Sequence, residues 1–404
     1  MRVAHYMSRL RLEDGGVVRA VLDLCAALAA TGGGHEITLL TLDGKDVPQE
    51  WGREPNTPRV QTLARSAFPL PRLNRRSIDQ ARAAIQSAEV LHLHVPWDPI
   101  CSQLARLARR IGRPYVMSIH GMLDDWCLDQ KAAKKKLFLK LGGTRMLERA
   151  AAVHCTATAE AEQSRRWFPR GNPAVVPLIM DLSDYEYLPG PDLARQQVAD
   201  AACDEPIALF LSRLHHKKGL DVLIDAAARL RDDGVRVRVL IAGTGNEAYI
   251  RSLQGRIRQQ NLDKSVRLIG FVKGREKVSL YEAASVFVLP TSQENWGFVL
   301  IESMAAGTPV ITTRGVDIWP ELESSGAAII TEAAVDSIAK AVASLVENPS
   351  RSRDMGQAGR SWVLNSLRVP QVVRRYEALY LDICRKLPKA ERTLGRSKAG
   401  RELE

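Results

Sequence analysis

The sequence, 404 residues long, lacks the marks of a membrane-spanning or secreted protein. No apolar run approaches the ~18 residues that a membrane-spanning helix requires. The N-terminal segment MRVAHYMSRLRLEDGG has no hydrophobic signal-peptide region and is typical of a first strand with its following loop. These absences predict a cytoplasmic protein, which could still associate peripherally with the inner face of the cell membrane.

Cysteines and aromatic residues are also few. The six cysteines form no C-x-x-C pair, so zinc and redox motifs lack support, and Cys25 and Cys155 are predicted to be buried thiols. A net charge of +11 suits an anionic substrate, an anionic membrane or nucleic acid. Because aromatic residues make up only 5% and no nucleic-acid reader motif is present, we expect no nucleic-acid partner.

Alternating strand and helix patterns indicate the α/β class and two domains. Residues 1–180 open as a strand, a loop ending in Gly15-Gly16, a helix and a second strand, as nucleotide-binding domains do. Residues 43–76 are predicted to be an irregular loop region because they are rich in proline and arginine. The acidic, proline-containing segment 181–206 is typical of an interdomain linker, and a second α/β series follows over 207–368. The basic tail 387–404 is predicted to be disordered.

Three histidines lie at strand positions where they could have a function. His92 and His94 alternate on one side of a predicted strand over 90–95. Two histidines without a third ligand are more often core or cleft residues than a metal site, so no metal is expected. His120 ends another predicted strand and precedes Gly121, at the edge where open α/β sheets bind ligands. The alternative is that His120 is a turn residue with a structural role.

The segment PTSQENWGFVLIESMAAGTPVITT, residues 290–313, predicts a strand end, a loop, a helix and a second strand. Glu294 in the loop and Glu302 on the helix lie eight positions apart, with Gly297 between them. A helix N-terminus flanked by two carboxylates suits a phosphorylated polyol, because free N–H groups bind phosphate and carboxylates accept sugar hydroxyls. The alternative is that Glu294 caps the helix and Glu302 is a solvated surface residue.

Cations and glycines follow the first two strands of the second half. Arg213 and Lys218 lie in SRLHHKKG, where a guanidinium and an ammonium group could neutralise a diphosphate; as an alternative they are surface cations. Gly243 and Gly245 follow the next strand and form half of a dinucleotide fingerprint, with Ala248 in place of the third glycine.

These motifs resemble one family. E-N-W-G-F-V-L-I-E, followed by S-M-A-A-G-T-P-V-I, is similar to the E-x7-E signature of retaining GT-B glycosyltransferases of the GT4 class, the glycosyl transferases group 1. The resemblance covers nearly the whole chain. It implies two Rossmann-like domains that face each other across a cleft, with the acceptor on residues 1–180 and the nucleotide sugar mainly on residues 207–368. A C-terminal helix at about 369–386 would pack back on the first domain.

The resemblance also implies roles for individual residues. Glu302 would bind the ribose hydroxyls, Glu294 and His120 the donor sugar, and the pair Arg213 and Lys218 the diphosphate. Trp296 stands where the family more often has phenylalanine, and Ser212 where it usually has glycine. The remaining donor-binding positions implied by the resemblance are Gly15, Gly16, Gly243, Gly245, Phe271, Val272, Trp296, Gly297 and Phe298.

The expected function is the transfer of a sugar from a nucleotide sugar to a glycan or lipid-linked acceptor, with retention, in bacterial-type polysaccharide biosynthesis. No cofactor and no metal are expected, since no D-x-D motif is present. The alternatives are a sugar-nucleotide epimerase or hydrolase, an NAD-dependent oxidoreductase and a basic nucleic-acid-binding protein. The lysine-rich segment 131–150 predicts a basic amphipathic helix that could lie on an anionic membrane, although an ordinary solvated helix fits as well.

Overall fold

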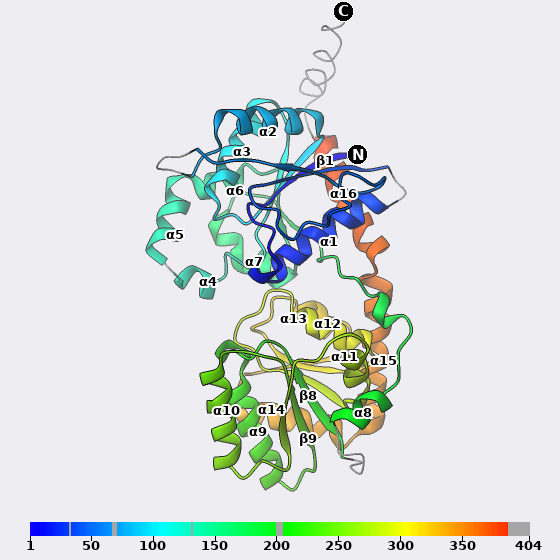
Figure 1. Ribbon diagram of the computed structural model, residues 1–404. Helices are drawn as coiled ribbons and strands as arrows, with labels where there is room; N and C mark the ends of the chain where they lie inside the picture. The colour runs from blue at the N-terminus through cyan, green and yellow to red at the C-terminus, as the bar shows by residue number, and fades with distance from the viewer. Residues whose placement is uncertain (32–33, 67–70, 131, 199–204, 387–404) are drawn as a thin grey trace, which may run out of the picture. The chain divides into compact units, whose positions relative to one another are not determined.

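The computed structural model describes the chain except residues 32–33, 67–70, 131, 199–204 and 387–404. Two compact units divide it (Figure 1). Unit 1 consists of Met1–Met180 together with the chain from Val369, and unit 2 consists of Asp181–Arg368. The predicted disordered tail, 387–404, lies outside the described residues.

Unit 1 is built on a parallel sheet with strand order β3-β2-β1-β4-β5-β6-β7 among the described residues. Its central strands are buried along their whole length, as expected for a parallel sheet that is covered on both faces, although β4 and β6 include histidines. The strands are β1 (Arg2–Tyr6), β2 (Glu36–Thr41), β3 (Arg59–Thr62), β4 (Val90–His94), β5 (Tyr115–Ser118), β6 (Ala152–Cys155) and β7 (Pro173–Val175).

The helices of unit 1 include the last helix of the chain. The side of α16 that carries Val372, Tyr376 and Tyr380 is buried, and α16 packs against α1 (Figure 1). Cys25 on α1 and Cys155 on β6 are buried thiols, as predicted. The helices are α1 (Gly16–Ala30), α2 (Arg75–Ser87), α3 (Pro99–Arg110), α4 (Asp125–Asp129), α5 (Ala132–Phe138), α6 (Thr144–Glu148), α7 (Thr158–Ser164) and α16 (Val369–Lys386).

Two predictions for unit 1 were wrong in detail. Residues 43–76 are not all irregular, because they contain edge strand β3, whose RVQT sequence is mostly exposed and lacks an apolar pattern. The basic segment 131–150 is not one helix. A π-type turn at Leu139–Gly143 separates α5 from α6, and Gly142 adopts a positive φ of 141° there. A glycine pair inside the segment allows this break.

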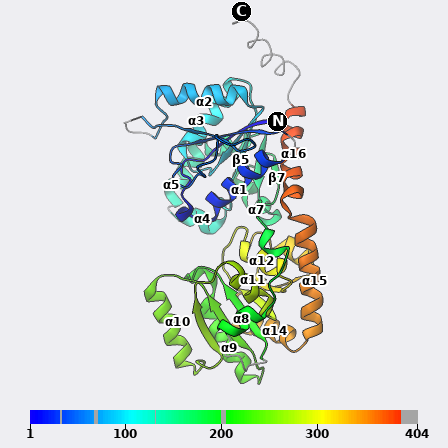
Figure 2. The ribbon, with the colours of Figure 1, turned by 45° about the vertical axis from the view of Figure 1, so that its right-hand side comes forward.

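Unit 2 has a second parallel sheet, with strand order β10-β9-β8-β11-β12-β13 among the described residues. In Figure 2, α15 lies beside α12, and the two helices pack together. The strands are β8 (Ile207–Leu211), β9 (Arg238–Ala242), β10 (Val266–Gly270), β11 (Val286–Leu289), β12 (Val310–Thr313) and β13 (Ala328–Thr331). The helices are α8 (Asp192–Val198), α9 (Leu220–Asp232), α10 (Glu247–Gln259), α11 (Gly274–Ala283), α12 (Phe298–Ala305), α13 (Trp319–Ser324), α14 (Val335–Val346) and α15 (Pro349–Ser366).

The segment 181–206, which we expected to be a linker, is in part structured. It carries α8, which packs against α11 of unit 2. Ser279 on α11 donates a hydrogen bond to the carbonyl of Gly190 (2.6 Å) and accepts one from the Ala194 N–H (3.0 Å). The acidic composition of segment 181–206 is therefore compatible with a surface helix, α8, that packs against unit 2.

Each sheet reverses its strand order at one point. In unit 1 the order reverses between β1 and β4, and in unit 2 between β8 and β11. In open α/β sheets, ligands bind outside the carboxyl ends of the strands at this switch point. Both sheets thus confirm the predicted Rossmann-like α/β class, and the switch points are the places to look for a site.

Candidate functional site

The loops after β8 and β11 meet at the switch point of unit 2. Lys218 follows β8 and Glu294 follows β11, and the Lys218 ammonium forms an ion pair with the Glu294 carboxylate. The Lys218 side chain is only 5% exposed, whereas 25% of the Glu294 side chain reaches solvent. Because an ammonium group has three donors, the pair leaves Lys218 able to bind a further anion.

Arg213 lies on the same loop as Lys218 but in a different environment. It is exposed and forms no ion pair with a described residue. A free guanidinium group beside a buried ammonium group suits a ligand that carries two negative charges. Both cations therefore lie at the carboxyl edge of the sheet, next to the switch point.

The glycines of this edge pack tightly against neighbouring backbone. A Cβ on Gly243 would lie 1.9 Å from the Ser212 carbonyl oxygen, and one on Gly245 would lie 2.2 Å from that of Leu214. On Gly219, it would lie 2.0 Å from the Pro290 carbonyl oxygen. These glycines let the loops close on one another, which is a structural role that the sequence had not indicated.

Helix α12 begins at Phe298, and its N-cap is Gly297 in a left-handed conformation (φ 65°). No side chain caps this helix, so Glu294 does not have the capping role considered as an alternative. Trp296 is buried, and its indole nitrogen finds no acceptor among the described residues. The preceding loop is fixed by the hydrogen bond from Asn295 to Asp317 (2.9 Å) and by that from the Glu294 N–H to Gly315 (2.7 Å).

Glu302 lies in the second turn of α12 and is held from α11. The Lys277 ammonium donates to one carboxylate oxygen (2.8 Å) and the Tyr281 hydroxyl to the other (2.9 Å). The Glu302 side chain is 15% exposed, so it is not a solvated surface residue. A carboxylate has about four acceptor sites, which leaves capacity for the two hydroxyls of a ribose.

Lys277 and Tyr281 are site residues that the sequence analysis missed. They lie four positions apart on one face of α11, a helix that was not predicted. Burial, followed by the charge of Glu302, raises the pKa of Tyr281 well above its ordinary value, so the hydroxyl remains a donor. In the sequence, only the K-x3-Y spacing indicates that Lys277 and Tyr281 lie on the same face of a helix. That spacing predicts a site only once α11 is known to pack beside Glu302.

The other predicted donor-binding positions of unit 2 lie near strand or helix ends. Phe271 follows β10 and is 70% exposed, and the neighbouring Val272 is half-buried. Phe298 is half-buried at the start of α12. An aromatic ring that is mostly exposed at a sheet edge is available to stack on a base.

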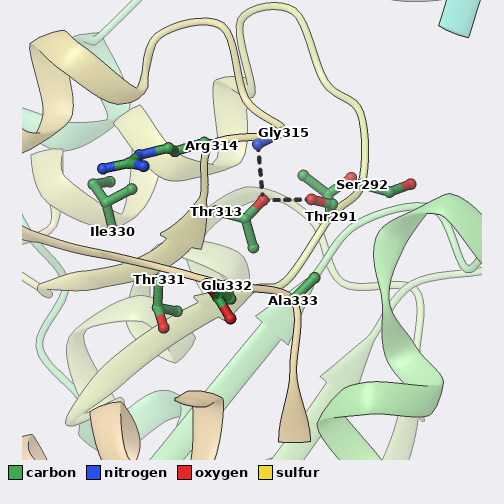
Figure 3. Close-up of a pocket in the computed structure, with 9 residues that line it drawn as sticks. All are labelled: Thr291, Ser292, Thr313, Arg314, Gly315, Ile330, Thr331, Glu332 and Ala333. Carbon is green, nitrogen blue, oxygen red and sulfur yellow. Dashed lines mark hydrogen bonds between the residues drawn. The ribbon is translucent and has the colours of Figure 1, made fainter.

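A pocket of about 580 Å³ lies at the ends of β11, β12 and β13 (Figure 3). Thr313 lies at its centre, where it donates to the Thr291 carbonyl (2.5 Å) and accepts from the Gly315 N–H (3.1 Å). Arg314 and Ile330 form one wall. None of the predicted donor-binding residues is in the described lining of this pocket. We therefore do not assign the donor to it, and infer that its hydrogen bonds hold the 290–297 loop in place.

At the switch point of unit 1 the predicted positions are His120 and the pair Gly15-Gly16. Gly15 has a φ of 110° and nothing lies within 4 Å of its missing Cβ, so the start of α1 is open. His120, just beyond β5, also has a positive φ (51°), and so does Val95 after β4 (68°). A positive φ is strained for a β-branched residue, and such strain gathers at functional sites.

Five of the eight histidines are buried together beside this switch point: His5, His92, His94, His120 and His154. Burial lowers the pKa of His5 and His120 to about 3 and that of His154 to about 4, and it also lowers the pKa of His92 and His94. The rings are therefore neutral at physiological pH.

The structure adds His5 on β1 to the pair His92 and His94. One nitrogen of each ring lies within 4.8 Å of the others, close enough for three ligands of one metal ion. However, the two nitrogens of His92 already lie 2.7 Å from the Tyr380 hydroxyl and 2.6 Å from that of Ser118. A metal would have to displace one of these bonds, so the geometry favours a hydrogen-bonded core.

The His120-Gly121 turn is anchored by a buried carboxylate. Glu160 on α7 accepts hydrogen bonds from the Gly121 N–H and from the Thr156 hydroxyl (2.7 Å). The Glu160 side chain is inaccessible, so its role is to hold the backbone of the turn. Glu160 thus anchors the backbone of the turn that carries His120.

Comparison with known proteins identifies the class. Two family models match: residues 15–178 match "Glycosyl transferase 4-like domain" and residues 195–362 match "Glycosyl transferases group 1". The sucrose-phosphate synthase structure from Thermosynechococcus elongatus is 22% identical, covers 95% of this chain and 98% of that chain, and superposes with a TM-score of 0.69. The two parallel Rossmann-like sheets thus define the GT-B architecture.

Characterised relatives are similar over shorter segments. The GDP-mannose-dependent alpha-(1-6)-phosphatidylinositol dimannoside mannosyltransferase of Mycobacterium tuberculosis is 30% identical over 62% of this chain, and the match spans 64% of the relative's length. Alpha-maltose-1-phosphate synthase of the same species is 26% identical over 74% of this chain and 81% of its own. The chain belongs to the group 1 glycosyltransferases of the GT4 class, as its motifs predicted.

Proposed function

We propose that the chain transfers a sugar from a nucleotide-sugar donor to a lipid-linked or glycan acceptor, with retention of anomeric configuration. The observation that supports this most is the arrangement at the switch point of unit 2. There, Lys218 pairs with Glu294 and Lys277 pairs with Glu302, beside the exposed Arg213. Two carboxylates suit sugar and ribose hydroxyls, and the cations suit the diphosphate between them.

In this proposal Arg213 and Lys218 stabilise the charge that develops on the leaving diphosphate. Glu294 holds Lys218 in place and accepts hydroxyls of the donor sugar. Glu302, oriented by Lys277 and Tyr281, binds the ribose, while Phe271 and Val272 border the base. The open start of α1 at Gly15 and Gly16, with His120, binds sugar oxygens in unit 1. The protein cations supply the positive charge that a metal would otherwise supply.

Transfer is distinguished from its rivals by products. The protein is incubated with UDP-, GDP- and ADP-sugars that are labelled in the sugar, with and without a lipid or glycan acceptor. Transfer gives a labelled acceptor, an epimerase gives a new nucleotide sugar, and a hydrolase gives free sugar without acceptor. Wild-type binding of a donor, with no transfer to any acceptor of either class, would contradict the proposal.

The acceptor is proposed to be lipid-linked, and unit 1 to bind an anionic membrane peripherally, as expected for an enzyme of bacterial-type polysaccharide synthesis on the cytoplasmic face. Lys134, Lys136 and Lys140 are exposed on the α5–α6 segment, next to Leu137 and Leu141, which are 54% and 78% exposed. Each lysine near an anionic surface contributes about 1 kcal/mol to binding. The similarity to a phosphatidylinositol dimannoside mannosyltransferase supports a lipid acceptor. No described helix is long and apolar enough to cross a membrane.

Liposome sedimentation tests the membrane assignment. Wild type should pellet with anionic vesicles and be released at ~0.5 M salt, where surface charges are screened. Changing Lys134, Lys136 and Lys140 to Glu should keep it in the supernatant. Lys135 is left in place because it lies over the Trp97 ring, 5.2 Å from the centroid.

The control changes Lys264, Lys340 and Arg351 of unit 2 to Glu, which alters the charge equally at three exposed positions. This variant should pellet like wild type. If both variants lose binding equally, only the net charge matters. A soluble acceptor, such as a sugar phosphate, then becomes the better proposal.

A further inference from the structure

A chain of three buried histidines ends at His120. His5 Nδ1 lies 3.1 Å from His94 Nε2, and His94 Nδ1 lies 3.1 Å from His120 Nε2. The rings come from β1, from β4 and from the turn after β5, and the plane of the His94 ring is nearly parallel to those of its two neighbours (12° and 27°), with ring centroids 5.5 and 5.4 Å apart. The two end nitrogens, His5 Nε2 and His120 Nδ1, are buried and have no partner among the described residues. We call these three residues the histidine chain.

The histidine chain can hold its protons in only two ordered ways. Each ring is neutral and carries one proton, and each link needs one donor and one acceptor. In the first order, His5 donates to His94 and His94 donates to His120, so His120 carries its proton on Nδ1. In the second order every bond is reversed, His120 carries its proton on Nε2, and the unpaired N–H belongs to His5.

The surroundings of the two ends decide between these orders. His5 Nε2 is 0% exposed in the core, where an N–H without an acceptor costs more than a bare ring nitrogen. His120 lies at the carboxyl edge of the sheet and keeps 6% of its surface exposed, so of the two end rings it is the one that a ligand can approach, although its Nδ1 is shielded in the free protein. The first order places the unpaired N–H at the end where a ligand can accept it.

We infer that His94, backed by His5, fixes His120 in the Nδ1–H tautomer, so that His120 presents a neutral N–H donor to an oxygen of the sugar substrate. His94 and His5 are positioning residues that do not touch the substrate. The ligand named here rests on the proposed function, whereas the tautomer is a property of the free protein. Because burial keeps the rings neutral, the donor selects a hydroxyl oxygen and does not act as a cation.

A second group of bonds beside the histidine chain provides a matched control. His154 lies near His120, with ring centroids 6.4 Å apart, but its Nδ1 bonds the Ser118 hydroxyl (2.6 Å) and its Nε2 the Val176 carbonyl (2.8 Å). His154→Phe and His94→Phe therefore each remove one buried imidazole and its bonds, and each keeps a ring of similar size. Only His94→Phe cuts the histidine chain.

The tautomer is measured by ¹⁵N NMR of histidine-labelled full-length protein without ligand, with the His120 signals assigned by their loss in His120→Gln. Wild type and His154→Phe should show the proton of His120 on Nδ1. His94→Phe should move it to Nε2, because that nitrogen has then lost its donor. His94→Asn should restore Nδ1–H, since the asparagine amide nitrogen lies near the position of Nδ1 and can donate to His120.

Transfer kinetics provide the second measurement. His94→Phe should lower kcat/KM for sugar transfer about fivefold, the effect of one neutral hydrogen bond, while affinity for the free nucleoside diphosphate stays unchanged. His94→Asn should recover most of that loss.

An Nε2–H tautomer in wild type, the same tautomer in His94→Phe as in wild type, or one equivalent of tightly bound metal in the purified protein would each overturn the inference. A confirmed tautomer in a protein that transfers no sugar would count against the proposed function alone. If His94→Phe does not fold, the His120 tautomer in wild type and in His94→Asn still tests the inference, which requires Nδ1–H in both.

Discussion

The two sheets reverse their strand order at equivalent places, but the side chains there are mainly uncharged in unit 1 and charged in unit 2. Unit 1 gathers five neutral, buried imidazoles beside β1 and β4, whereas unit 2 gathers two lysine–carboxylate pairs and a free arginine beside β8 and β11. One fold thus prepares two kinds of site, and the side chains decide what each can bind. Charged pairs suit a diphosphate and its ribose, and neutral imidazoles suit uncharged hydroxyls.

The largest predicted difference is in sensitivity to acid. His5 and His120 have a pKa of about 3 in the folded protein, against 6.5 when unfolded. Below pH 6.5 the unfolded state therefore binds more protons, and stability that is complete above that pH is lost as the pH falls toward 3. At pH 5 these two groups destabilise unit 1 by about 4 kcal/mol together, and the other three buried histidines act in the same direction.

Hydrogen exchange followed by mass spectrometry can measure this for each unit. Between pH 7.5 and 5, after correction for intrinsic exchange rates, peptides of β1, β4 and β5 should lose protection before those of β8 and β11. Unit 2 has two histidines, His215 and His216, and both are exposed. Equal loss of protection in both units would show that the histidines are hydrated or charged in the native state.

The second prediction concerns the cations of unit 2. Arg213→Ala and Lys218→Ala should each lower the rate of sugar transfer by roughly 10²–10³, if both stabilise the leaving diphosphate. Arg236→Ala, at another exposed arginine of unit 2, is the matched control and should keep the wild-type rate. Lys218→Ala also leaves the Glu294 carboxylate without its partner, so its thermal unfolding must be compared with that of Arg213→Ala. Wild-type rates in both variants would identify them as structural or surface cations.

The third prediction concerns the ribose. Glu302→Gln should weaken nucleotide binding by about 1.5–3 kcal/mol, because a charged acceptor becomes a neutral amide. The change also ends the ion pair with Lys277, so folding is checked by thermal unfolding without ligand. Isothermal titration with the nucleoside diphosphate measures the effect. Unchanged affinity in a folded variant would remove Glu302 from the nucleotide site.

The sequence predicted the elements better than the contacts between them. The apolar strands could be predicted because each has a local hydrophobic pattern. The relation of Glu294 to Glu302 could be predicted because both lie in one loop and the helix that follows it. The partner of Glu302, Lys277, and the third histidine, His5, were not predicted, because they come from other elements that only tertiary packing brings close. His5 lies in the apolar strand β1, where nothing in the local sequence marks it as part of a group. Edge strand β3 was missed for a related reason, since an exposed strand has no hydrophobic period.

The smallest predicted effect separates orientation from charge at Glu302. Tyr281→Phe removes one hydrogen bond of 2.9 Å to the carboxylate and leaves Lys277, at 2.8 Å, in place. The ring is fully buried, and phenylalanine keeps its volume, so the fold should be retained. Loss of one neutral donor costs about 1 kcal/mol, so nucleotide affinity should fall about fivefold, clearly less than in Glu302→Gln. In Tyr281→Phe/Glu302→Gln the two effects should not add, because the tyrosine acts only through the carboxylate. Additive losses would show that Tyr281 stabilises the site by a route independent of Glu302.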